Sequence, residues 1–321
     1  MNKAVPDSTP IPVYFLLLPG YILMEFAGAA EALRLANRDR PQAVYALHFI
    51  GLEATVCNSL GMSTPGLAPL PASLPDGAWL LIPGLTDAET KLQTPAAIAA
   101  MRWLREVMHP GIRLVTICSA ALLAGRAGLL DGRECTTHYS LLAGLKAAAP
   151  AAMVSENRVF VIDGNIASSA GVTTGVDLIL ELISQSAGPR LALEVAREMV
   201  VWMRRDAASP QLSPYLMHRN HLHPAIHRVQ DAIAADPAQA WPMHELARIA
   251  CLSERHLARL FKTHVGVSPL DYRQQMQLSQ VQPLMAQANR SMEQIADLAG
   301  FGSARDMRRV WLKHKGVPLR A

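Results

Sequence analysis

The sequence predicts two domains of different class: an α/β domain with a largely parallel sheet, then an all-α domain with two helix-turn-helix units. Three observations support this prediction. Apolar strands alternate with amphipathic helices over about the first 200 residues, a pattern typical of parallel sheets covered by helices. A short segment then occurs twice near the C-terminus, and positive charge is concentrated in that same part of the chain.

Residues 1–206 are predicted to form the α/β domain. Most of the expected strands are buried apolar runs that end at Pro-Gly or lead directly into a helix. The expected strands are residues 11–18, 45–52, 78–82, 112–117, 134–136, 159–162 and 166–169, and the expected helices are 25–37, 96–107, 120–130, 176–186 and 189–204. Asp163-Gly164-Asn165 indicates a hairpin between the last two strands. Parallel sheets of this kind bind ligands at the carboxyl ends of their strands.

The duplicated segment runs from Leu246 to Val267 and again from Ile295 to Val317. Each copy has the layout of a helix-turn-helix. Ser253 and Ser303 stand where the second helix of each copy should begin, and serine is a preferred N-cap. Ser291 and Gln294 form a capping box at the start of the second copy. We therefore expect residues 225–321 to form the second domain, with a helix over residues 270–287 joining the copies.

Each expected recognition helix has an apolar face and a cationic face. The apolar residues follow the i, i+3, i+4 spacing of a core stripe; they are Leu257, Leu260, Phe261, Met307, Val310 and Trp311. The cationic residues are Arg255, Arg259, Lys262, Arg305, Arg308 and Arg309. Such side chains contact phosphates and guanine edges when the helix enters a major groove. Ser303 and Ala304, at the start of the second recognition helix, are also expected to meet base edges. The alternative is a pair of amphipathic hairpins with solvated basic faces.

The distribution of charge favours an anionic partner for the C-terminal domain only. Residues 1–209 contain 16 Lys/Arg and 18 Asp/Glu, whereas residues 210–321 contain 14 and 8, so net charges of −2 and +6 underlie the total of +4. Basicity confined to the repeats indicates a local nucleic-acid surface rather than general binding to polyanions or membranes. No apolar run approaches the ~20 residues of a membrane span.

The cysteine and histidine patterns argue against metal or disulfide sites. The four cysteines are widely spaced with no C-x-x-C, which favours a reducing cytoplasm. Residues 207–224 have two prolines before Tyr215 and lack an apolar period, so we interpret them as a linker. His218, His221, His223 and His227 form a possible metal cluster, but no Cys or carboxylate joins them. A hydrated linker is the preferred interpretation.

The C-terminal part resembles the DNA-binding domain of AraC-type regulators over roughly its last hundred residues. The resemblance is carried by Phe261, Gly266, Pro269, Tyr272-Arg273, Gly300-Phe301, Arg309 and Gly316. Trp311 and Lys315 depart from it, since the family favours Phe at these positions. The resemblance implies that both recognition helices enter successive major grooves of double-stranded promoter DNA.

A nucleophile elbow is indicated by Val115 to Ala120, where a buried strand leads into Cys118 and then directly into a helix. The helix start is expected to lower the pKa of the thiol, and an anion would bind there near Ser119. The alternative is a cysteine that only fills space under a tight turn, because free cysteines are often buried.

The same region, with the residue runs 124–132 and 136–138, Ala170-Gly171 and 175–177, resembles the PfpI/ThiJ superfamily. That resemblance implies a flavodoxin-like, glutamine-amidotransferase-like sandwich over residues 11 to 200. Joined to the AraC-type tail, it resembles the GlxA-type transcriptional regulators. It further implies that Glu25 faces Cys118 and that His138 lies near the thiol. Ala120 departs from the Gly that the superfamily's enzymes often carry there.

Two functions remain open for this pocket. We expect it to bind a ligand without turnover, because a sensor joined to a DNA reader needs binding to change its geometry. The resemblance implies nitrogen-containing metabolites such as betaines, carnitine or amino acids. Tyr21 or Tyr139 would face a quaternary amine, whereas Trp79 and Trp103 are expected in the core. The alternative is a hydrolase or hydratase that uses Cys118 as nucleophile.

The expected protein is thus a cytoplasmic, ligand-responsive transcriptional regulator without enzymatic activity. Its expected partners are double-stranded promoter DNA, a small-molecule effector and a second copy of the chain, with no membrane partner. Neither a cofactor nor a metal is expected.

Overall fold

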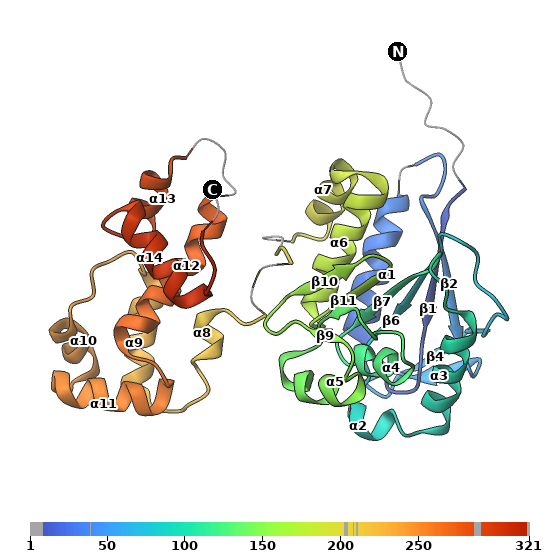
Figure 1. Ribbon diagram of the computed structural model, residues 1–321, viewed down its shortest axis with the longest axis horizontal. Coiled ribbons are helices and arrows are strands. Elements are labelled where there is room, and N and C mark those ends of the chain that lie inside the picture. Colours follow the sequence, from blue (N-terminus) through green and yellow to red (C-terminus); the bar gives the residue numbers. More distant parts are fainter. Residues whose placement is uncertain are drawn as a thin grey trace, which may run out of the picture. The chain divides into compact units, whose positions relative to one another are not determined.

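The chain divides into two compact units, residues 1–211 and 212–321. The computed structural model describes residues 9–38, 40–201, 205–207, 209, 211–285 and 290–319 (Figure 1). Among these residues, no helix combines the length and apolar character needed to cross a membrane. The domain limits expected at residues 206 and 225 stay predictions.

The first unit is built on a seven-stranded sheet with the order β10-β11-β7-β6-β1-β2-β5. The strands are β1 Ile11–Leu16, β2 Tyr45–Gly51, β5 Ala68–Pro69, β6 Trp79–Ile82, β7 Arg113–Ile117, β10 Phe160–Asp163 and β11 Ile166–Ser169. All neighbouring pairs are parallel except β10 and β11, which form an antiparallel hairpin. The predicted parallel sheet and the predicted hairpin are both confirmed.

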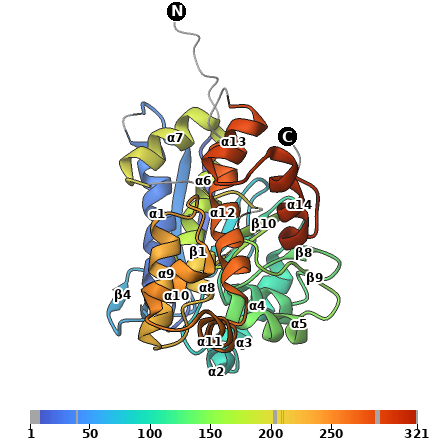
Figure 2. The same cartoon turned by 90° about the vertical axis from the view of Figure 1, so that its left-hand side faces the viewer.

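Helices in two groups flank this sheet, as Figures 1 and 2 show. One group is α1 (Leu23–Asn37), α6 (Thr173–Ala187) and α7 (Pro189–Glu198); the other is α3 (Pro95–Val107), α4 (Ala120–Arg126) and α5 (Leu142–Ala148). The central strands are buried on both faces, with every residue of β6 in the core. Trp79 and Trp103 are 4% and 8% exposed, which confirms their predicted place in the core.

Several short elements could not be predicted from periodicity because they span only two to four residues. They are β3 Thr55–Cys57, β4 Ser63–Pro65, α2 Ala88–Lys91, η1 Tyr139–Leu141 and β9 Met153–Val154. The strand expected at residues 134–136 is present as β8 Glu134–Cys135. Two predicted helices are shorter than expected. α4 ends at Arg126 because Gly128, with φ +75°, turns the chain out of the helix, and α7 ends at Glu198; residues 202–204 of that prediction lie outside the described residues.

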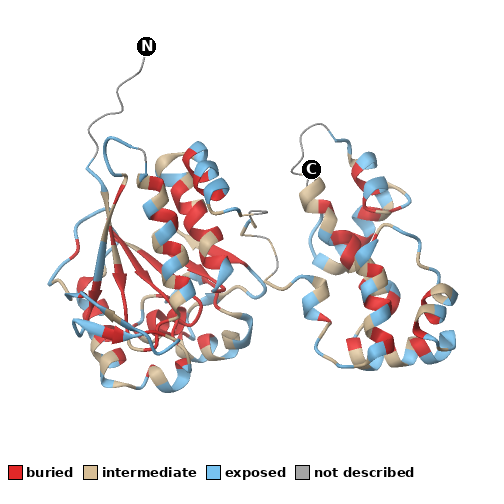
Figure 3. Ribbon diagram, turned by 180° about the vertical axis from the view of Figure 1, so that it is seen from behind, coloured by how far each residue is buried: buried red, intermediate tan, exposed pale blue. Residues whose placement is uncertain are grey.

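The second unit is all helical, as predicted. Its helices are α8 Pro214–Met217, α9 Pro224–Ala235, α10 Met243–Ala250, α11 Glu254–Val265, α12 Pro269–Met285, α13 Met292–Leu298 and α14 Ala304–Lys315. Two separate buried clusters form its core. The buried residues of these helices are coloured red on the ribbon of Figure 3. α12 belongs to both clusters: Tyr272 packs with α9, α10 and α11, and Val281 packs with α13 and α14. One helix therefore holds the two helix-turn-helix units together.

The expected linker is not hydrated throughout, contrary to the prediction. α8 forms within it, and Tyr215 packs against the core of the first helix-turn-helix unit. His218 is 8% exposed, with Nδ1 3.1 Å from the Val265 carbonyl oxygen and Nε2 2.7 Å from Gln275 Oε1. The stretch lacks an apolar period because it packs through a few isolated side chains rather than along a helical face.

Candidate functional sites

Cys118 occupies a strained turn between β7 and α4. Its φ is +55°, in the left-handed region that side chains other than glycine rarely adopt. The Cys118 N–H donates to the Ser169 carbonyl at 2.9 Å, and the Thr137 hydroxyl donates to the Cys118 carbonyl at 2.8 Å. Only 7% of the residue is exposed. The predicted strand-turn-helix geometry is confirmed, with neighbouring backbone holding the cysteine on both sides.

Glu25 meets Cys118 from the first turn of α1, as the resemblance implied. The carboxylate is 1% exposed and accepts from the Gly84 N–H at 2.7 Å and the Val172 N–H at 2.9 Å. Burial raises the pKa of Glu25, although these two backbone donors and a hydrogen bond with the Cys118 side chain act in the opposite direction. The carboxyl group is therefore fully engaged inside the protein.

The environment raises the pKa of the Cys118 thiol, although the Ser119 N–H at the helix start lowers it as predicted. The causes are burial first and then the charge of Glu25, which together outweigh the lowering effect of the Ser119 N–H. At neutral pH the sulfur is a neutral thiol. A neutral thiol is a poor nucleophile, so the geometry favours a ligand contact over attack on a substrate.

Two glycines that the strand pattern does not single out as site residues form the walls beside this pair. A Cβ on Gly84 would lie 2.8 Å from Glu25 Oε2 and 2.9 Å from Cys118 Cβ. A Cβ on Gly171 would lie 2.8 Å from Cys118 Sγ, and its φ of +104° also requires glycine. The only sequence signal for Gly84 is its place in the Pro-Gly pair that ends β6.

Ser119 and His138 form their side-chain hydrogen bonds with residues other than Cys118. Ser119 is 2% exposed, and its hydroxyl donates to the Leu85 carbonyl at 3.0 Å and accepts from the Leu85 N–H at 2.7 Å. These bonds hold the Ser119 hydroxyl on a neighbouring loop rather than toward an anion. The Nδ1 of His138 instead lies 2.7 Å from the Ser140 hydroxyl. Among the described residues, no hydrogen bond joins His138 to Cys118.

The two candidate aromatic residues differ in their availability. Tyr21 is fully buried, and its hydroxyl is 2.7 Å from the Thr64 hydroxyl, so its ring is not open to a ligand. Tyr139 is 50% exposed, with its ring centroid 4.3 Å from that of His138. Of the pair, only Tyr139 still offers a face to a cation.

In the second unit the predicted caps of the recognition helices are present. The Ser253 hydroxyl accepts from the His256 N–H, and the Ser303 hydroxyl accepts from the Asp306 N–H. Gly266 and Gly316 end the two helices with φ of +84° and +70°. The capping box of Ser291 and Gln294 is also confirmed. These local signals could be read from the sequence because each involves residues three or four positions apart.

The cationic faces of α11 and α14 are exposed, as predicted. All six basic residues are exposed, and the apolar residues opposite them lie in the core, with Leu257, Phe261 and Met307 fully buried. Arg309 pairs with Asp306 at 2.5 Å. Each of the other five has no ion pair with another described residue.

The prediction that Ala304 meets base edges is contradicted by its burial. Ala304 is 2% exposed and belongs to the core of the second helix-turn-helix unit. The Ala304 N–H donates to Glu293 Oε2 at 2.9 Å, so this turn of α14 packs against α13. Ser303 is intermediate in exposure and uses its hydroxyl as the cap.

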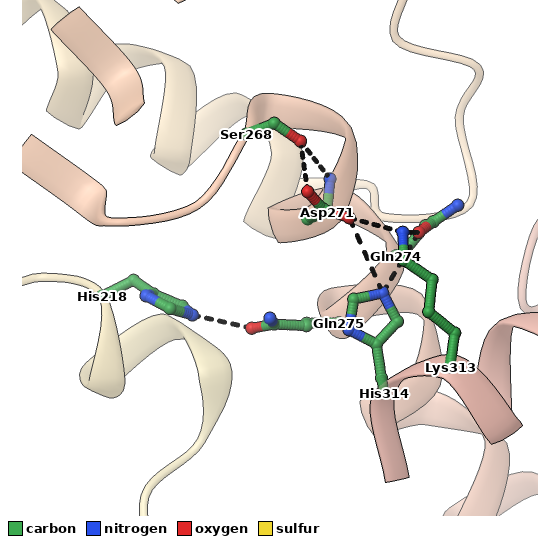
Figure 4. A network of polar contacts seen from close by, with 7 residues as sticks. All are labelled: His218, Ser268, Asp271, Gln274, Gln275, Lys313 and His314. Carbon is green, nitrogen blue, oxygen red and sulfur yellow. Dashed lines mark hydrogen bonds and ion pairs between the residues drawn. The ribbon is translucent and has the colours of Figure 1, made fainter. Parts of the chain in front are cut away.

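Polar contacts fasten the C-terminal end of α14 to the start of α12 (Figure 4). Lys313 Nζ donates to Asp271 Oδ1 at 2.6 Å and to Gln274 Oε1 at 3.1 Å. His314 Nε2 lies 3.1 Å from the same Gln274 oxygen, and Ser268 donates to Asp271 Oδ2 at 2.6 Å. The Lys313 ammonium group is therefore already bonded within the protein, unlike the guanidinium groups of Arg305 and Arg308, which have no ion pair with a described residue.

Comparison with known proteins finds a family match for each of the two parts of the chain. A DJ-1/PfpI family profile matches residues 12–185, and a helix-turn-helix domain profile matches residues 246–321. The chain is 30% identical to the HTH-type transcriptional regulator GlxA of Rhizobium meliloti over 294 residues, which cover 90% of this chain and 88% of that protein. It is 32% identical to an isonitrile hydratase of Pseudomonas putida over 106 residues, 32% of this chain and 44% of the hydratase.

A solved structure shares the fold of the first unit. The crystal structure of an AraC family transcriptional regulator from Pseudomonas putida aligns with a TM-score of 0.51 and 26% sequence identity. The alignment covers 59% of this chain and all of that one.

Proposed function

This chain belongs to the DJ-1/PfpI family and to its HTH-type transcriptional regulators, and on that premise we propose how it regulates. The helical unit binds double-stranded promoter DNA through α11 and α14. The α/β unit binds a small effector beside Cys118 and Glu25. Binding of the effector then changes the affinity of the helical unit for DNA.

The observation that carries the DNA-binding proposal is the exposed cationic face on each capped recognition helix. Arg255 and Arg259 lie one turn apart on α11, and Arg305 and Arg308 lie three residues apart on α14. Arginine side chains in such positions pair with phosphates or with guanine O6 and N7. Two reading helices held by one connecting helix favour a site that spans successive major grooves.

Selection of bound sequences from random duplexes tests this proposal. The wild-type chain is expected to enrich one bipartite motif, and the double variant Arg255→Ala/Arg305→Ala is expected to enrich none. Lys313→Ala is the matched control on α14, because this lysine already pairs with Asp271. If the wild-type chain enriches no motif, the proposal fails.

For the α/β unit we propose ligand binding without catalysis. The neutral thiol, the engaged Glu25 carboxylate and the Ser119 hydroxyl bonded to Leu85 support a recognition site. A nitrogen-containing metabolite fits this proposal, since Tyr139 offers an exposed aromatic face to a cationic nitrogen. Thermal-shift measurements with L-amino acids, glycine betaine and carnitine test it, because a ligand that prefers the native state raises Tm.

The partial match to a hydratase and the Glu25–Cys118 pair support one rival, an enzyme that uses Cys118 as nucleophile. Turnover assays on the full chain separate the two functions. Conversion of an isonitrile or amide by the wild type, lost in Cys118→Ala, supports the enzyme. Effector binding without conversion supports the sensor.

We further propose that the regulator acts in the cytoplasm as a homodimer. The four cysteines Cys57, Cys118, Cys135 and Cys251 are free, and two of them are exposed, which suits a reducing compartment. Helix-turn-helix regulators commonly bind as dimers to two half-sites. Light scattering of the purified chain tests the dimer, and a mass of about 35 kDa, that of one chain, would contradict it.

A further inference from the structure

The last described residues of the first unit are hydrogen-bonded to two segments that contact the Cys118–Glu25 pair. One attachment is Arg205, whose N–H and Nε donate to the buried carboxylate of Asp177 at 3.0 and 2.8 Å. Its Nη2 donates to the Thr173 hydroxyl at 2.8 Å. Thr173 directly follows Val172, whose N–H donates to Glu25. This attachment therefore lies one residue from the loop that touches the pocket carboxylate.

The second attachment is Gln211, the last residue of the unit. Its Nε2 donates to the Thr137 carbonyl at 2.9 Å, and its N–H donates to Asn157 Oδ1 at 3.1 Å. The Thr137 hydroxyl in turn donates to the Cys118 carbonyl at 2.8 Å. Two hydrogen bonds through a single residue thus join the backbone of the cysteine to the residue at which the unit ends.

Two glycines pack closely against the Cys118–Glu25 pair. A methyl group on Gly84 or Gly171 would overlap Cys118 and Glu25. A ligand that enters between these glycines and Cys118 would displace the 171–172 loop or shift the strained Cys118 turn. Displacement of the 171–172 loop would move the adjoining Thr173. A shift of the Cys118 turn would strain the hydrogen bond between the Thr137 hydroxyl and the Cys118 carbonyl.

We propose that the described residues near the end of the first unit (205–207, 209 and 211) are the output segment of the sensor. The inference rests on the proposed function: effector binding at Cys118 loosens the bonds of Thr137 and Thr173, which releases Gln211 and Arg205. Release changes the position and freedom of the chain at Leu212, where the DNA-binding unit begins. A segment held by a few side-chain bonds suits such a switch, because small differences in binding shift its population. Gln211 is then a positioning residue.

Hydrogen exchange measured by mass spectrometry on the full chain tests the connection without DNA or effector. Thr137→Val removes the bond to the Cys118 carbonyl and is expected to speed exchange about fivefold in peptides that cover 155–162 and 205–216, as for the loss of one net hydrogen bond. Thr137→Ser keeps the hydroxyl and is expected to match the wild type. Thr64→Val removes the distant hydroxyl contact of Tyr21 and is also expected to leave these peptides unchanged.

A double-mutant comparison then shows whether the signal passes through Gln211. Gln211→Met alone is expected to speed exchange in the same peptides, and Thr137→Val added to it is expected to have no further effect, because coupled residues are not additive. Independent effects of the two changes, or wild-type exchange at 205–216 in Thr137→Val, would overturn the inference. Should Thr137→Val fail to fold, a comparison of Gln211→Met with Ser209→Ala tests the linker end. Among the described residues, the Ser209 side chain bonds Asp206 alone.

The outcome is separable from that of the proposed function. If wild-type protein enriches no DNA motif but the exchange results hold, the connection is real and the regulator proposal fails. If the motif is enriched but the exchange rate of the output segment is the same in Thr137→Val as in the wild type, the regulator proposal is supported and the path through Gln211 is rejected.

Discussion

Gly300, in the turn of the second helix-turn-helix unit, is pressed against the backbone of Ala238 in the loop before α10. A Cβ added to Gly300 would overlap the Cα and carbonyl oxygen of Ala238 and would lie 2.7 Å from its carbonyl carbon. Gln277 of α12, 1% exposed, donates to the Gly300 carbonyl at 2.8 Å. This contact joins segments of both helix-turn-helix units to the helix that connects them.

Gly300→Ala is expected to destabilise the helical unit by about 1–3 kcal/mol. The residue has φ +77° and no space for a methyl group, so backbone strain and overlap both contribute. Thermal unfolding measures the loss. Gly302→Ala is the control two residues away, because a Cβ there meets nothing within 4 Å. Equal stability of the two variants would show that the Ala238 contact is loose in solution.

Arg305→Ala is expected to weaken DNA binding by about 1–3 kcal/mol and to relax sequence preference at one base pair. Arg305 is exposed and has no ion pair with a described residue, whereas Arg309 forms an ion pair with Asp306. Affinities of the wild type and Arg305→Ala for duplexes changed one base pair at a time test the prediction. A uniform loss for every duplex, with the salt slope reduced by about 1, would assign Arg305 to a phosphate instead.

Glu25→Gln is expected to lower the pKa of the Cys118 thiol. The charge of Glu25 is one of the two main causes that raise this pKa, and the amide removes it. The rate of thiol alkylation against pH, measured in a Cys57→Ser/Cys251→Ser background, reports the change. The profile of the variant is expected to move to lower pH. An unchanged profile would show that burial alone raises the pKa of the Cys118 thiol.

Protonation of His221 is expected to destabilise the fold in mild acid. Burial first, and then the neighbouring His227 and His264, lower the pKa of His221 below its ordinary value of 6.5. Below that value the unfolded chain binds the proton more readily than the folded chain, so this contribution is complete above pH 6.5 and is lost as pH falls toward the folded pKa.

Comparison with His221→Gln isolates this effect from other titrating groups. The Tm of the wild type minus that of the variant is expected to decrease between pH 7.5 and pH 5.5. A difference that stays constant or increases over this range would contradict the prediction.

Sequence and structure agree best where the signal is local. The caps at Ser253, Ser303 and Ser291 and the cationic face around Arg255 follow from residues within one or two helical turns. The burial of Ala304 does not follow from its sequence neighbours, because its exposure depends on how closely α13 approaches α14. The resemblance placed Glu25 opposite Cys118 correctly, but it could not show that Ser119 is bonded to Leu85 or that His138 is bonded to Ser140.

The sequence by itself determined the class of both domains, the duplicated reading helices and which of their faces carries charge, because periodicity and capping are properties of neighbouring residues. Only the tertiary structure decided the chemistry of the pocket. Glu25 and Val172 are 147 residues apart in the chain and are joined by a hydrogen bond, and the burial that raises the pKa of Cys118 arises from segments on both sides of it. A pKa depends on the dielectric and charges that surround a group in space, and that surrounding exists only after the distant segments have packed.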